Sequence, residues 1–131
     1  KNAFLKDRFR FLADEEEKHR SFLTQQYEVQ FPKKTLELPE VSPVPLPEID
    51  TGFERNPMSK IIQQAMEAER AAYDFYISFA KYVQSNKSLT ETLRYFARME
   101  ESHYQMLKQE QEAEQEFEAF DDFNPLMHEG A

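Results

Sequence analysis

The sequence predicts an all-α fold in which three long helices belong to one helical bundle with a long crossover. Three observations lead to this prediction. Glycine is scarce, at 2 of 131 residues, whereas the helix-favouring residues Glu, Gln, Ala, Leu and Lys are plentiful. Apolar residues recur at steps of three and four in three separate segments. Six of the seven prolines fall between residues 31 and 59, which separates the first segment from the other two.

Length and composition limit the class of protein. A chain of 131 residues suits one domain, and 40% apolar residues, with 12 Phe and 6 Tyr, suffice for a core. The net charge of −9 argues against nucleic-acid binding, which needs clustered Lys and Arg. No apolar run approaches membrane length and we find no secretory signal, so we expect a cytoplasmic protein. The absence of cysteine excludes disulfides, a thiolate nucleophile and cysteine-bound metal.

The first helix is expected at about residues 2–30, a stretch without Pro or Gly. Its apolar stripe contains Leu5, Phe9, Leu12, Glu16, His19 and Leu23. Residues 31–59 then form a long, mostly extended connector because of their prolines. A connector of this length is uncommon inside a compact domain, and a crossover between antiparallel pairs of helices explains it.

The second helix is expected at about residues 57–85. Asn56 is a suitable N-cap, and Pro57 is favoured at the first helical position. The apolar stripe of this helix contains Ile62, Met66, Glu69, Tyr73, Tyr76, Ala80 and Val83.

The third helix is expected at about residues 89–122. Ser88 and Glu91 have the spacing of a capping box at its start, and Asn124-Pro125 would end it. Its acidic final part, EQEAEQEFEAFDDF, is expected to be a solvated face. The apolar stripe contains Leu89, Leu93, Phe96, Glu100, His103 and Leu107.

Two stretches of the chain, FLADEEEKHRSFL at 11–23 and YFARMEESHYQML at 95–107, are alike at an offset of 84 residues. Each places a Glu three residues before a His. The pair is Glu16 and His19 in the first stretch, and Glu100 and His103 in the second. Apolar positions match together with the polar pair, which indicates an internal repeat of whole helices.

The repeated pairs have the composition of a metal site. Residues three apart share a helix face, so each pair aims a carboxylate and an imidazole the same way. Both pairs interrupt an apolar stripe, where an ionised carboxylate must find partners or take up a proton. Two such pairs facing each other, with a further carboxylate between them, make a dinuclear site for iron or manganese, with zinc as another candidate. Glu69 is that carboxylate because it lies on an apolar stripe, whereas Glu67 points roughly 200° away.

Other interpretations of the single motifs remain open. Glu fills 19 positions, so one Glu-x-x-His pair alone would indicate a surface ion pair. The repeat and the position of Glu69 favour the metal site. Tyr76 lies seven residues after Glu69 on the same face, where it either packs in the core or hydrogen-bonds a ligand carboxylate.

These motifs resemble those of a known family. LADEEEKH (12–19) and FARMEESH (96–103) resemble the second and fourth helices of rubrerythrin-like proteins in the ferritin-like superfamily. EAERAAYDFY (67–76) resembles the third helix. The resemblance covers three helices and the crossover, and implies a ferritin-like four-helix bundle of which this chain contains three helices.

The resemblance also implies roles for the residues of the site. Glu16 and Glu100 would bridge two metal ions, which are iron in this family. His19 and His103 would each bind one ion, and Glu69 would be a terminal carboxylate ligand. Tyr76, the one catalytic residue expected besides the ligands, would hydrogen-bond near them and handle protons.

A function follows from the resemblance. It implies a non-haem di-iron oxidoreductase that reduces hydrogen peroxide or dioxygen, with an electron donor that the sequence does not identify. A ferroxidase or small ferritin-like iron store would use the same ligands. A helical assembly protein with a structural metal is a third interpretation, and its site would be coordinatively closed. We expect a homo-oligomer that binds neither nucleic acid nor membrane.

The sequence departs from the family pattern in three respects. Without cysteine it contains no rubredoxin domain to feed electrons to the metals. Ala72 stands where rubrerythrins with strong peroxidase character carry a further Glu. The first helix of the family, with its own Glu and Tyr, is not in this sequence. We therefore expect either that the natural chain continues upstream of Lys1 or that a second copy supplies the helix by swapping.

Overall fold

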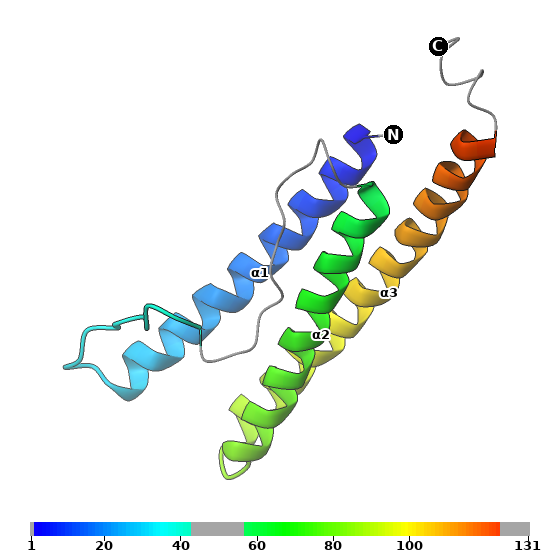
Figure 1. Cartoon of the computed structure of the whole chain (residues 1–131). Coiled ribbons are helices and arrows are strands. Elements are labelled where there is room, and N and C mark those ends of the chain that lie inside the picture. The colour runs from blue at the N-terminus through cyan, green and yellow to red at the C-terminus, as the bar shows by residue number, and fades with distance from the viewer. Residues whose placement is uncertain (1, 43–56, 124–131) are drawn as a thin grey trace. The chain divides into compact units, whose positions relative to one another are not determined.

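The computed structural model describes residues 2–42 and 57–123 (Figure 1). These residues form three helices, α1 (Asn2–Gln30), α2 (Met58–Tyr82) and α3 (Lys87–Phe123), and no strand. None of the three helices has the long apolar stretch that crossing a membrane requires. The chain divides into two compact units, Lys1–Pro43 with α1 and Val44–Ala131 with α2 and α3. The all-α prediction is confirmed, while the single domain stays a prediction.

The unit Lys1–Pro43 contains α1 over the range expected for it. Leu5 and Leu12 of the predicted stripe are buried. Glu15 is also buried, which was not expected, and its carboxylate accepts a hydrogen bond from the Lys18 ammonium at 2.9 Å. Residues 31–42 of the predicted connector are exposed and belong to no helix or strand. Residues 43–56 of that connector lie outside the described residues.

In the unit Val44–Ala131, α2 and α3 run antiparallel and pack against each other (Figure 1). Their predicted apolar stripes meet, as the spacing of three and four requires. Burial of a side chain as complete as that of Leu93 or Leu107 contributes roughly 1.5–3 kcal/mol. The buried apolar residues of this unit are Ile62, Met66, Tyr76, Ala80, Leu89, Leu93, Phe96, Ala97 and Leu107.

The turn between these helices comprises residues 83–86, so α3 begins at Lys87, earlier than predicted. Asn86 caps α3, because its Oδ1 accepts a hydrogen bond from the N–H of Leu89 at 3.1 Å. The predicted capping box of Ser88 and Glu91 is therefore wrong. Asn86 lies two residues earlier and caps the first turn through the Leu89 N–H, so Ser88 falls inside the helix.

The start of α2 is capped from α3. Pro57 occupies the N-cap with an extended backbone (ψ 152°), and not the first helical position as predicted. Proline offers no side-chain acceptor for the free N–H groups of the first turn. The Glu118 carboxylate takes that place, accepting hydrogen bonds from the Ser59 N–H at 3.2 Å and from its hydroxyl at 2.7 Å. Asn56, the predicted N-cap, lies outside the described residues.

The acidic end of α3 is not the uniformly solvated face that the sequence predicted. Glu114 is buried and Glu118 is half-buried, since both continue the stripe that contains Leu107. Gln111 lies on the same side and donates to the carbonyl of Ser59 at 3.3 Å. A carboxylate at the N-terminus of α2 is also favoured by the helix dipole, so this segment holds the two helices in register.

We expect Glu118→Ala to lower the free energy of unfolding by about 1 kcal/mol, because the first turn of α2 loses its cap. Urea unfolding followed by circular dichroism measures this change. Glu116→Ala is the matched control, since Glu116 is exposed on the same turn of α3. Equal unfolding midpoints for the two variants would refute the capping role.

Candidate metal centre

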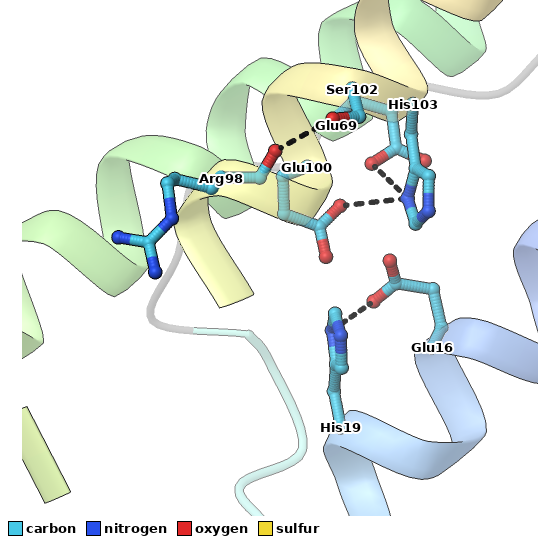
Figure 2. A network of polar contacts seen from close by, with 7 residues as sticks. All are labelled: Glu16, His19, Glu69, Arg98, Glu100, Ser102 and His103. Carbon is cyan, nitrogen blue, oxygen red and sulfur yellow. Dashed lines mark hydrogen bonds and ion pairs between the residues drawn. The ribbon is translucent and has the colours of Figure 1, made fainter. Parts of the chain in front are cut away.

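Three of the predicted ligands come together within the unit Val44–Ala131 (Figure 2). Glu69 belongs to α2, and Glu100 and His103 belong to α3. Each offers a ligand atom, and these atoms lie within 4.8 Å of one another. The Nδ1 atom of His103 lies 3.6 Å from a carboxylate oxygen of Glu69 and 3.7 Å from one of Glu100. All three residues are buried, and Glu100 is 0% exposed.

Helix geometry accounts for this convergence. Glu100 lies midway between Leu93 and Leu107, seven residues from each, and therefore on the same buried stripe of α3. His103 follows three residues later on that face. Glu69 takes the corresponding place on the buried stripe of α2, so the packing of α2 on α3 brings its carboxylate to the imidazole.

The distances and the donor atoms fit a metal ion. A good N–H···O hydrogen bond has a donor–acceptor distance of about 2.9 Å, and the contacts of His103, at 3.6 and 3.7 Å, are longer. Two atoms that each lie about 2.1 Å from one ion at a tetrahedral angle are roughly 3.4 Å apart. Two buried carboxylates also need positive charge close by. Carboxylate and imidazole donors suit iron, manganese or zinc, so the cluster fits metal binding.

In the protein without metal, a proton on His103 supplies part of this positive charge. Burial lowers the pKa of His103, but its contacts with Glu100 and Glu69 outweigh burial and raise the pKa from 6.5 to about 10. The folded-state pKa is above the unfolded value. The protonated imidazole therefore stabilises the metal-free protein below about pH 6.5, and this contribution is lost as the pH rises through about 10.

We expect metal binding at pH 7 to release a proton from His103, because metal ions bind the neutral imidazole. Titration calorimetry with zinc in buffers of different ionisation enthalpy measures the number of protons released. The observed binding enthalpy should change with the buffer in proportion to about one proton per site. An enthalpy that is the same in every buffer would show that no proton leaves.

The unit Lys1–Pro43 contains the other predicted pair. Glu16 and His19 lie one turn apart on α1, with a carboxylate oxygen of Glu16 at 3.7 Å from His19 Nδ1 (Figure 2). The same atoms of Glu100 and His103 are also 3.7 Å apart. His19 is buried, as His103 is. The two Glu-x-x-His frames thus have the same local geometry, as an internal repeat predicts.

Tyr76 and Glu67 occupy different environments on α2. The Tyr76 ring is buried and makes edge contacts with the rings of Phe96 and Phe75, each with centroids 5.5 Å apart. These contacts agree with the core-packing role, and a hydrogen bond from Tyr76 to a ligand carboxylate stays a prediction. Glu67 is exposed, as expected, and accepts a hydrogen bond from Gln63 at 3.4 Å.

A pocket beside the cluster contains residues to which the sequence analysis gave no role at the site. Tyr73 lies four residues after Glu69, and Tyr104 lies four residues after Glu100. A Tyr one helical turn after each carboxylate is the signal that could have identified them. The pocket is lined by Glu69, Arg70, Tyr73, Glu100, Glu101 and Tyr104.

Over the described residues, three helices, two of which carry a Glu-x-x-His pair and one a buried carboxylate, have the features of the ferritin-like carboxylate proteins. The family model described as Rubrerythrin matches residues 1–111, and the chain therefore belongs to the rubrerythrin family. The predicted family is confirmed, and the match includes α1, α2 and the part of α3 up to residue 111, with every predicted ligand. No curated protein and no solved structure matches the chain.

Proposed function

We propose that this protein is a non-haem di-iron oxidoreductase that reduces hydrogen peroxide. The observation that carries the proposal is the buried cluster of Glu69, Glu100 and His103. Membership of the rubrerythrin family supports iron as the metal. Glu16 and His19 repeat the geometry of the α3 pair, and we assign them to the same centre on the strength of the repeat and the family.

The proposed reaction is a two-electron reduction. Two bound iron ions would supply the electrons by passing from iron(II) to iron(III). The O–O bond of hydrogen peroxide breaks, and with two electrons and two protons two water molecules form. An external electron donor then returns two electrons to the protein before the next peroxide is reduced.

Residues of the chain would balance the positive charge of the metals and transfer the protons that the reaction consumes. Glu69 and Glu100 are buried carboxylates, so they balance the positive charge of the metals where little water screens it. The imidazole of His103 binds metal once it has lost its proton. Tyr76 is buried on the same face of α2 as Glu69, two turns further along, and we assign its hydroxyl to proton transfer near the ligand carboxylates.

Comparison of two oxidants tests this function. Protein loaded with iron(II) without oxygen is mixed with hydrogen peroxide or with dioxygen, and iron oxidation is followed by absorbance. The proposal predicts faster oxidation by peroxide and no ferric mineral. Preference for dioxygen together with a retained ferric core would favour a ferroxidase or iron store. Iron that neither oxidant oxidises would indicate a structural metal.

Ala72 provides a prediction about the rate of peroxide turnover. It lies three residues after Glu69 on α2. The family resemblance implies a Glu at the matching position of rubrerythrins with strong peroxidase character. A carboxylate there would follow an iron ion as its charge changes, so Ala72→Glu should raise the rate by about tenfold. Steady-state peroxide consumption at equal iron content measures this change.

The control for this prediction is Ala71→Glu, since Ala71 is also half-buried but lies on another face of α2. That variant should leave the rate unchanged. If Ala72→Glu loads iron normally and the rate stays the same or falls, Ala72 does not limit peroxide reduction.

A further inference from the structure

The pocket beside the cluster is lined by exposed residues as well as by the two buried carboxylates. Arg70 and Glu101 line its outer part and are exposed, while Glu69 and Glu100 line its inner part and are buried. Tyr73 and Tyr104, both half-buried, lie in between. All of these residues belong to α2 or α3, so the pocket is formed within the unit Val44–Ala131.

Two lining residues of the pocket, Arg70 and Tyr104, form a cation–π pair. The guanidinium carbon of Arg70 lies 4.9 Å from the centre of the Tyr104 ring. A hydrogen bond to the Tyr104 side chain raises the pKa of Arg70, which agrees with the contact between the guanidinium and the ring. Because the Arg70 side of this pair is exposed, the contact is weak, and its loss should leave the packing of the two helices intact.

Charge limits what passes this pair. The carboxylates of Glu69 and Glu100 repel anions, while Arg70 and Glu101 at the exposed end carry opposite charges. A small uncharged molecule meets no electrostatic barrier. Hydrogen peroxide is uncharged and both donates and accepts hydrogen bonds, which the carboxylate of Glu101 and the hydroxyls of the two tyrosines can satisfy.

We propose that this pocket is the access route for hydrogen peroxide and that Arg70 and Tyr104 form its gate, which excludes bulkier organic hydroperoxides. This inference rests on the proposed function and adds the route by which the substrate reaches the centre and the residues that select it. Arg70, Tyr73 and Tyr104 are thereby specificity-determining residues. They act on access to the centre, and metal binding does not depend on them.

Opening the gate tests the selectivity. Tyr104→Ala and wild type are loaded with iron(II) to equal content and mixed with hydrogen peroxide or tert-butyl hydroperoxide. The rate constant for tert-butyl hydroperoxide should rise about tenfold in the variant, and that for hydrogen peroxide should change less than about threefold. Tyr95→Ala is the matched control, because Tyr95 also lies under an arginine, Arg98 at 5.9 Å, but does not line the pocket. It should change neither rate.

Narrowing the pocket gives a readout that does not depend on oxidation. Tyr73→Trp should slow the binding of nitric oxide to the iron(II) protein about fivefold or more, as followed by absorbance. If wild type binds iron and nitric oxide but no hydroperoxide oxidises it, the proposed function fails, and the nitric oxide rates still decide whether the pocket is the access route.

Three results would contradict the proposal that this pocket is a gated access route. The first is unchanged selectivity in Tyr104→Ala at full iron content, with Tyr104→Leu replacing it if the alanine variant does not fold. The second is an unchanged nitric oxide rate in Tyr73→Trp. The third is a change in the rate of iron(II) uptake with unchanged oxidant rates, which would make the pocket the route of the metal.

Discussion

Metal-free protein should melt about 10 °C below protein that is kept with metal at a concentration of roughly a hundred times Kd. The physical reason lies in the cluster of Glu69, Glu100 and His103. Its carboxylates are buried, and without a metal ion the protonated His103 beside them supplies positive charge in its place. A metal ion binds the native state alone and stabilises it by mass action.

Calorimetric melting of chelator-treated protein, with metal content verified, measures this difference. Addition of iron(II), manganese or zinc should restore the higher melting temperature. The control is Glu100→Ala, whose melting temperature should not respond to these metals. A wild-type melting curve that is the same with and without metal would remove the main support for a metal centre.

Loss of metal binding in Glu100→Ala is the second large effect. Glu100 is 0% exposed and lies 3.7 Å from the imidazole of His103. Altering residues that only support metal ligands costs about 10–100-fold in affinity, so removing a ligand carboxylate should cost more than about 100-fold. His103→Ala and Glu69→Ala should behave in the same way.

Glu67→Ala is the matched control for Glu69→Ala, because both residues are Glu on α2 and Glu67 is exposed. Competition with a coloured chelator gives the affinity for zinc in each variant. Metal affinity in Glu100→Ala within a few-fold of wild type, or an equal loss in Glu67→Ala, would place the site elsewhere.

Local periodicity explains what the sequence could predict. The buried positions Leu93, Glu100 and Leu107 follow from the spacing of one helix, and the separation of Glu100 and His103 follows from one helical turn. Glu69 could be distinguished from Glu67 because only one of them lies on the apolar stripe. These inferences need no knowledge of how one helix packs on another.

Contacts between distant residues could not be predicted in this way. Glu118 caps α2 through Ser59, 59 residues away, and that contact depends on the register between two helices. The start of α3 was misplaced because Asn86 and Ser88 are both good N-caps, and the end of the preceding turn decides between them. The pocket likewise depends on which side chains of α2 and α3 meet.

The number of iron(II) ions bound per chain tests the central claim most directly. An anaerobic titration of metal-free protein, followed by iron analysis after desalting, should give two ions in wild type. His19→Ala and Glu69→Ala should retain fewer, since they remove a ligand from α1 and from α2 respectively, whereas Glu67→Ala should retain two. Two ions that persist in both His19→Ala and Glu69→Ala, or no bound iron in wild type, would contradict a dinuclear centre built from these residues.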